Sequence, residues 1–267
     1  MNMGDARVAD RRRGTVLAVK VDAVTADEAL LRVLSWAKVR ESRYICACNV
    51  HAVVTAWREP SFSQVVDGAD LALPDGAPVA WVLRRLGFEG QMRVCGPDFM
   101  WDLCRLSGER GIAVCLVGST EPVLEKLAAR LQAAFPALRL AGAWSPPFRP
   151  LTTEEDAELV ERINGSGAGV AFIGLGCPKQ ERWMASLRGR VHAAMIGVGA
   201  AFEFHAATRT RAPLWMQRHG LEWLHRLGSE PRRLSKRYLV TNAMFLAGAA
   251  GQLIRRGLHP RGSSGKP

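Results

Sequence analysis

One segment, Gly174 to Trp183, constrains the fold of this chain more than any other. It reads Gly-Leu-Gly-Cys-Pro-Lys-Gln-Glu-Arg-Trp and directly follows the apolar run Val170–Ile173. An apolar run closed by Gly-x-Gly is typical of a buried parallel strand that enters a tight turn. Pro178 suits the first turn of a helix, where no backbone N–H is needed. The segment therefore predicts a strand, a glycine turn and a helix whose N-terminus suits a phosphate.

Strand-like and helix-like segments alternate along the rest of the chain. Capping-box spacing marks helix starts at Thr25 with Glu28 and at Thr153 with Asp156. The apolar runs lack polar alternation, as strands do when both faces of a sheet are covered. The pattern predicts an open, mostly parallel α/β sheet of Rossmann type with helices on both faces. Its strands are expected at Thr15–Val21, Tyr44–Cys48, Leu71–Leu73, Ile112–Val117, Leu138–Ala141, Val170–Ile173 and Ala193–Ile196.

Polar groups and glycines follow four of these expected strands. They are Asn49, Asp75, Gly118-Ser119 and the segment Gly174–Gln180. Ligands of open α/β sheets bind beyond the carboxyl ends of the strands. The four segments are therefore expected to meet in one cleft, where Asp75 could take a proton from an attacking hydroxyl group. His51 is a second candidate for such a base.

The positive charge of the chain is concentrated at its C-terminal end. The net charge is +11, and residues 205–267 hold twelve Lys and Arg against two Glu. Such a basic end indicates a polyanionic partner, namely anionic lipid, nucleic acid or a pyrophosphate. Within it, residues 238–254 carry no charge and are flanked by Lys or Arg pairs. Seventeen residues are few for a membrane span, so a helix in the membrane interface is expected instead.

These observations divide the chain into four parts. We expect a disordered tail over residues 1–13 and a Rossmann-like core over 14–210. A helical, basic, membrane-associating appendage is expected over 211–257, and a flexible tail over 258–267.

Several classes of protein are disfavoured by motif. The six Cys include no CxxC pair and resemble buried free thiols of a reducing compartment. No P-loop, His-Glu-x-x-His or Asp-x-Asp metal motif occurs. The Gly-x-Gly turns at Gly174 and Gly197 lack the third glycine of a dinucleotide fingerprint. We therefore expect neither a metal nor a cofactor.

Several segments, taken together, resemble one protein family. In order and spacing they are similar to the WecG/TagA/CpsF glycosyltransferases, glycosyltransferase family 26, over about residues 15–240. The Pro-Lys-Gln-Glu block and the stretch from Arg-Ala-Pro to Glu-Trp are the most specific parts. The segments are Asn49–His51, Leu73–Gly76, Arg93–Asp98, Gly174–Glu181, Gly197–Phe202, Arg211–Trp215, Gly220–Arg226, Glu230–Arg232 and Arg237-Tyr238.

The resemblance implies an inverting, metal-independent transferase of cell-envelope polysaccharide synthesis. It would move a hexose, N-acetylmannosamine by first expectation, from a UDP-sugar to a saccharide on polyprenyl diphosphate such as undecaprenyl diphosphate. Another UDP-hexose, such as glucose or a uronic acid, is the alternative donor. The resemblance implies a cytoplasmic protein held peripherally on the anionic inner face of the cell membrane. A homo-oligomer is a further possibility.

The resemblance also implies roles for particular residues. Asp75 matches the general base, and Arg226, Arg232 and Arg237 match arginines that hold the lipid diphosphate. Ala47 departs from the Thr that many members carry two residues before the Asn, which removes a hydroxyl from the sugar pocket. With the glycine turns added, the candidates for binding UDP and substrate are Asn49, Arg93, Gly118, Gly174, Gly176, Lys179, Gln180, Glu181 and Gly199.

Two functions of other classes remain as alternatives. One is a nucleic-acid binder that uses the basic C-terminal end, although the chain lacks an aromatic-plus-basic module and nucleic acid is not an expected partner. The other is a membrane-associated homologue without catalytic activity. A turnover assay separates both from the enzyme.

Overall fold

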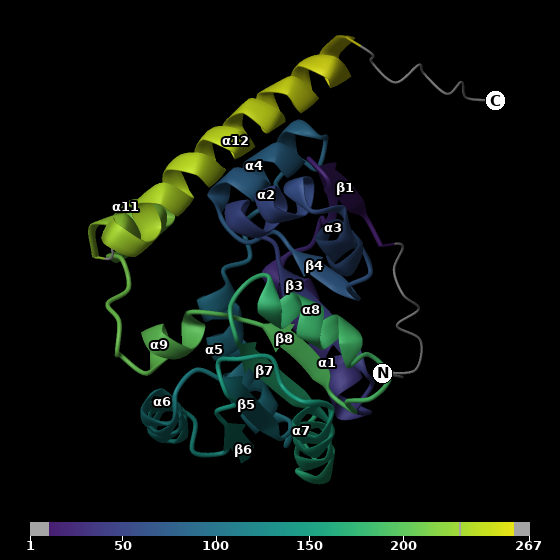
Figure 1. Cartoon of the computed structure of the whole chain (residues 1–267), viewed down its shortest axis with the longest axis vertical. Coiled ribbons are helices and arrows are strands. Elements are labelled where there is room, and N and C mark those ends of the chain that lie inside the picture. The colour runs from purple at the N-terminus through teal and green to yellow at the C-terminus, as the bar shows by residue number, and fades with distance from the viewer. Residues whose placement is uncertain (1–10, 230, 259–267) are drawn as a thin grey trace, which may run out of the picture.

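A parallel sheet forms the centre of the computed structural model, which describes residues 11–229 and 231–258. In this part of the chain six strands pair in the order β4-β3-β8-β7-β5-β6 (Figure 1). All five pairings are parallel, which confirms the expected open α/β sheet. The strands are β3 (Arg43–Ala47), β4 (Leu71–Leu73), β5 (Val114–Gly118), β6 (Leu140–Trp144), β7 (Val170–Gly174) and β8 (Ala194–Gly197).

Helices cover both faces of this sheet because successive strand residues point to opposite sides. Phe172 of β7 packs in the cluster on one face, and its neighbour Ile173 packs in the cluster on the other. The first face is covered by α1 (Ala26–Lys38), α5 (Gly96–Glu109), α6 (Glu121–Ala134) and α9 (Ala201–His205). The second is covered by α2 (Val50–Arg58), α3 (Pro60–Asp67), α4 (Ala77–Arg85), α7 (Thr153–Gly165) and α8 (Lys179–Ser186).

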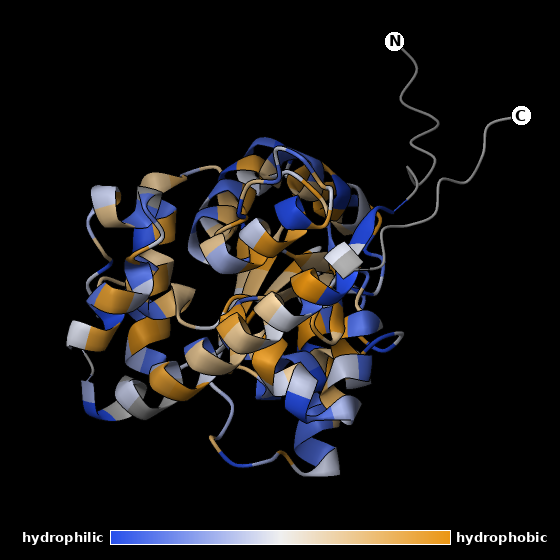
Figure 2. Cartoon of the chain, turned by 90° about the horizontal axis from the view of Figure 1, so that it is seen from above, coloured by the Kyte–Doolittle hydropathy of each residue, from blue (hydrophilic) through white to orange (hydrophobic). Residues whose placement is uncertain are grey.

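The hydropathy of the residues follows this layering. The strands in the middle are largely apolar, whereas polar residues colour much of the outer surface of the helices (Figure 2). Helix α1 illustrates the cause. Its capping box of Thr25 and Glu28 is formed as expected, and Leu30, Val33 and Leu34 lie on its buried face. Burial of one apolar stripe per helix thus holds the layers together.

Two local expectations were wrong. The single strand expected over Thr15–Val21 is an antiparallel hairpin, β1 (Arg13–Val16) and β2 (Val19–Asp22), with Leu17 in its turn at φ 54°. Its first strand begins inside the tail expected over residues 1–13, of which residues 1–10 lie outside the described residues. The capping box of α7 uses Thr152 with Glu155, one residue earlier than expected.

The hairpin is fixed by one buried carboxylate. Asp22 is 1% exposed and accepts hydrogen bonds from Arg11 Nε at 2.6 Å and from the backbone N–H of Ala72 at 2.7 Å. This carboxylate ties the hairpin to the edge strand β4. Alternation alone could not reveal the turn, because Leu17 and Ala18 continue the apolar pattern.

The C-terminal region is helical, as expected. Its first two helices are short, and its last helix is long. The helix expected from Pro213 to about His225 is broken into α10 (Leu214–Arg218) and α11 (Glu222–Ser229). Gly220 separates them at φ +72°, a conformation that favours glycine. The last helix, α12, runs from Pro231 to Leu258, and the residues after it lie outside the described part.

Helix α12 lies across the second face of the core, beside α2 and α4 in Figure 1. Phe245 and Ala249 are buried in the cluster on that face, and Gln252 Nε2 donates to the Thr15 carbonyl at 2.6 Å. No helix in the described part of the chain combines the length and the apolar character needed to cross a bilayer. Helix α12 packs on the core through Phe245 and Ala249.

Candidate active site

A cavity of about 1070 Å³ opens at the carboxyl edge of the sheet. It is lined by residues that follow β3, β4, β5, β7 and β8, which we call the core wall, and by residues of α11 and α12, which we call the appendage wall. Of the predicted site residues, the cavity brings nine together. They are Asn49, Asp75, Arg93, Gly174, Gly176, Gln180, Glu181, Gly199 and Arg226.

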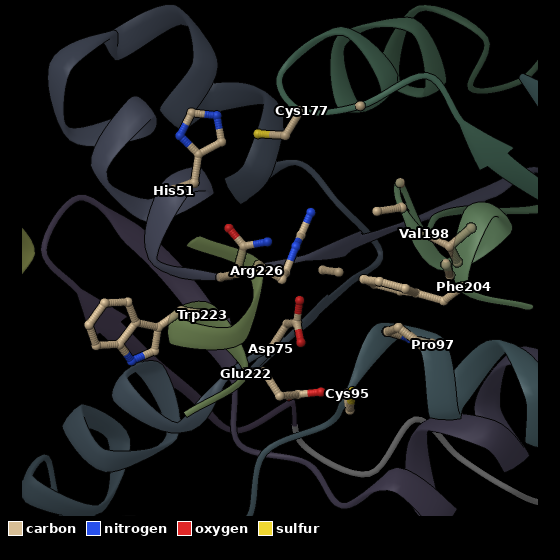
Figure 3. A pocket seen from close by; sticks show the side chains of 18 of the residues that line it. His51, Asp75, Cys95, Pro97, Cys177, Val198, Phe204, Glu222, Trp223 and Arg226 are labelled. Carbon is tan, nitrogen blue, oxygen red and sulfur yellow. The ribbon is translucent and has the colours of Figure 1, made fainter. Parts of the chain in front are cut away.

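Asp75 points into this cavity from the end of β4 (Figure 3). Burial raises the pKa of its carboxyl group to about 6. Hydrogen bonding by the backbone N–H of Gly96 and by the Asn49 side chain opposes this rise, and the negative charge of Glu222 adds to it. Asp75 is thus a carboxylate at neutral pH that is more basic than an ordinary Asp, as a general base requires.

Asn49 reaches Asp75 because it ends β3 and caps the next helix. Its Oδ1 accepts the backbone N–H of Ala52 at 3.1 Å, which fixes the N-terminus of α2. Its amide is then free to turn toward Asp75. One residue therefore sets both the start of a helix and the hydrogen bonding of the carboxylate.

The turn between β7 and α8 forms the floor of the cavity. Gln180 is locked there, because its Oε1 accepts the Gly176 N–H at 3.1 Å and its Nε2 donates to Glu181 Oε1 at 2.8 Å. Gly197 allows this, since a Cβ at that position would come within 2.8 Å of Gln180 Nε2. Burial raises the pKa of Glu181, which is 1% exposed.

Two residues predicted for UDP binding do not line the cavity. Lys179 Nζ donates to the carbonyls of Phe148 and Arg149 at 3.2 and 3.4 Å, so it holds the loop before α7. Gly118 makes the close approach of two strand ends possible, because a Cβ there would meet the Gly174 backbone at 2.6 Å. Lys179 therefore holds a neighbouring loop, and Gly118 allows two strand ends to lie close together.

A series of ion pairs next to the cavity links Arg93, Glu222, Arg211 and Asp98. Arg93 Nη1 donates to Glu222 Oε2, and Glu222 Oε1 lies 3.6 Å from Arg211 Nε. Arg211 Nη2 also donates to Asp98 Oδ2 at 2.9 Å. Burial alone would raise the pKa of Asp98, but Arg211 lowers it. Asp98 lies in the first turn of α5, forms no side-chain capping bond and binds Arg211.

The arginines predicted for the lipid diphosphate differ in position. Arg226 lines the cavity and lies over the ring of Phe204, 5.5 Å from its centroid. Arg232 is exposed on α12 and is not among the residues lining the cavity. The Arg237 side chain lies outside the described residues. Arg226 is thus the member of this set that the structure places at the site.

Several cavity residues were missed by the sequence reasoning or given other roles. Glu222 was not among the predicted site residues, although its i, i+4 spacing to Arg226 places both on one helix face. Phe148 lines the cavity with 80% of its side chain exposed, and nothing in its local sequence indicated this. His51, the second candidate for the base, and Ala47, which was expected in the sugar pocket, both line the cavity. In the described residues, no group of three or more His, Cys, Asp or Glu is placed to hold a metal ion.

A carboxylate of raised pKa beside several arginines, at this edge of an open α/β sheet, suits an enzyme that transfers groups from phosphorylated substrates. The match to known proteins is more specific. The chain belongs to the glycosyl transferase WecG/TagA/CpsF family, whose model matches residues 14–258. It is therefore a glycosyltransferase of cell-surface polysaccharide synthesis, and the family uses a sugar donor and a lipid-linked acceptor.

Proposed function

We propose that this protein transfers a hexose from a UDP-sugar to a saccharide carried on polyprenyl diphosphate, with inversion and without a metal ion. The hexose of first choice is N-acetylmannosamine. The observation that carries the proposal is the position of Asp75. Its basic carboxylate lines the same cavity as the glycine turn at Gly174–Gly176 and the Arg226 side chain.

In this mechanism Asp75 removes the proton from the acceptor hydroxyl group. The hydroxyl oxygen forms a bond to the anomeric carbon while the bond from that carbon to UDP breaks, so a single displacement inverts the configuration. The negative charge that develops on the leaving diphosphate needs cations nearby. Arg93 and Arg211 line the cavity and supply positive charge there.

The appendage supports the second half of the proposal, an acceptor at a membrane. Arg226 lines the cavity and can meet the diphosphate, and Arg232 is exposed on the next helix, where it can meet anionic headgroups. Large apolar side chains of the same region are exposed and suit a membrane interface on the cytoplasmic side. They include Leu214, Trp215, Leu239, Leu246 and Ile254.

A different hexose is the alternative donor. Ala47 lines the cavity with a methyl group where a hydroxyl would otherwise contact the sugar. A glucose or uronic acid donor is compatible with that change, because a pocket that lacks one hydrogen-bonding group discriminates differently between epimers.

The test is a screen of UDP-sugars against a short-chain prenyl-diphosphate saccharide, with UDP release as the readout. We expect release that depends on the acceptor and persists in EDTA. Release that is lost in EDTA and restored by magnesium or manganese would contradict the metal-independent mechanism. No release with any donor and acceptor pair would favour a homologue without catalytic activity.

A further inference from the structure

The ion pairs of Glu222 connect the appendage to the core across the cavity. Its two carboxylate oxygens face Arg93 and Arg211, which lie outside α11. Arg211 is itself held by the Asp98 carboxylate and by Cys95 Sγ at 3.3 Å. Glu222 thus pairs with one arginine, Arg211, that other groups also hold, and its own side chain is 24% exposed.

Helix α11 depends on such contacts because apolar packing hardly holds it. It spans eight residues and contains no buried residue. Trp223 meets Tyr238 of α12 edge to face, with ring centroids 6.4 Å apart. That contact attaches α11 to α12, whereas Glu222 attaches it to the core. The rotation of α11 about its own axis is therefore set by Glu222 at the start of the helix, together with the contact of Arg226 with the ring of Phe204 on α9.

Arg226 follows Glu222 by four residues, so both lie on the same face of α11. Figure 3 shows both side chains reaching into the cavity that holds Asp75. A rotation of α11 that separated Glu222 from Arg93 would also carry Arg226 away from the cavity. The Glu222 carboxylate therefore helps to fix the position of the Arg226 guanidinium.

We propose that Glu222 is a positioning residue for recognition of the anionic acceptor. Its ion pairs with Arg93 and Arg211 hold α11 so that Arg226 faces the diphosphate of the acceptor. The inference deepens the proposed function and rests on it, since it requires an acceptor with a diphosphate group. Glu222 itself transfers no proton in this account.

Kinetics of Glu222→Gln, Arg226→Gln and the double variant test this role. We expect Glu222→Gln to raise the KM for the acceptor about tenfold, because both of its ion pairs in a partly desolvated site are lost. The kcat and the affinity for UDP should change less than about twofold, and Glu222→Asp should recover part of the loss. In the Arg226→Gln background, Glu222→Gln should add less than about twofold.

A full tenfold effect of Glu222→Gln in the Arg226→Gln background would overturn the proposal, because Glu222 would then act without Arg226. Unchanged acceptor KM in Glu222→Gln would do the same. The control is Glu158→Gln, which removes an exposed ion pair with Arg162 on α7, away from the cavity.

Hydrogen exchange of the substrate-free protein separates a failure of this inference from a failure of the proposed function. Residues 222–229 should exchange several-fold faster in Glu222→Gln than in the unmodified protein and in Glu158→Gln. This result is expected even if no acceptor supports turnover. Equal exchange in all three proteins would show that Glu222 does not hold α11.

Discussion

The two walls of the cavity are built by different means. On the core wall, Gln180 and Glu181 are 4% and 1% exposed and lie in the first turn of α8, directly after a parallel strand and its glycine turn. On the appendage wall, α11 contains no buried residue and is held by ion pairs and ring contacts. Burial fixes the first wall along with the fold, whereas the second depends on a few polar contacts that ligands and salt can alter.

This difference matches the two substrates of the proposed reaction. A nucleotide-sugar meets the rigid turns of an α/β sheet, and a lipid diphosphate meets a basic helix near a membrane surface. Asp75 belongs to the core wall, at the end of β4, and lines the same cavity as Arg226. The predictions below change one wall at a time. They use point substitutions, because Phe245 and Ala249 of α12 are buried in the core and a truncation would expose that surface.

The largest effect is expected at Asp75. Asp75→Asn removes the proton acceptor but keeps the shape of the side chain, so transfer should fall roughly 100-fold or more. UDP affinity and the thermal midpoint of unfolding should stay close to those of the unmodified protein. A steady-state rate within a few-fold of the unmodified enzyme would remove Asp75 from the mechanism.

The second largest effect is expected at Arg226, on the appendage wall. Arg226→Gln should raise the KM for the lipid acceptor by roughly tenfold or more, because a charge-assisted contact to a diphosphate is lost. Its UDP affinity should not change. Arg162→Gln, on the exposed side of α7, is the matched control. If Arg226→Gln instead weakened UDP binding, the division between the two walls would be wrong.

The pH dependence of kcat/KM tests whether the charge of Glu222 on α11 influences the pKa of Asp75 on the core wall. Because the pKa of Asp75 is raised to about 6, activity should be full above that pH and fall about tenfold per unit below it. The charge of Glu222 contributes to the raised pKa, so Glu222→Gln should move the midpoint to lower pH. A midpoint near 4 in the unmodified enzyme would show that Asp75 is not in the environment described.

Salt tests the attachment of the appendage to membranes. Each cation near an anionic bilayer contributes about 1 kcal/mol, and the contribution fades within a Debye length. Co-sedimentation with vesicles containing anionic lipid should therefore weaken as the salt concentration rises. Neutral vesicles should retain less protein. Attachment that is indifferent to salt would assign the binding to the exposed apolar side chains alone.

The smallest effect is expected at Lys179. Its ammonium group binds the carbonyls of Phe148 and Arg149, so Lys179→Met should loosen this loop and change UDP affinity only a few-fold. Isothermal titration with UDP measures this directly. A loss as large as that of a missing phosphate ligand would show that Lys179 turns toward the nucleotide when it binds.

Much of the core wall could be predicted from the sequence, because its determinants are local. An apolar run followed by Gly-Leu-Gly-Cys-Pro specifies a strand and the turn after it, and parallel pairing then brings separate strand ends together. Asn49, Asp75 and Gln180 were found in this way. The orientation of Lys179 was not, because it depends on a loop about thirty residues earlier in the chain.

The appendage wall was harder to predict because its contacts are distant in sequence. Glu222 pairs with Arg93 across 129 residues, and no periodicity within either segment records that pairing. The break at Gly220 and the docking of Phe245 on the core are tertiary features of the same kind. The composition showed that this region is basic, but it could not show which of its arginines faces the cavity.

Hydrogen exchange with each substrate alone tests the division of the two walls most directly. UDP should protect the turn at residues 174–181 and leave residues 222–229 unchanged. A short-chain prenyl-diphosphate saccharide should protect residues 222–229 and leave the turn unchanged. Protection of α11 by UDP alone, or of the turn by the acceptor alone, would contradict the assignment of donor and acceptor to separate walls.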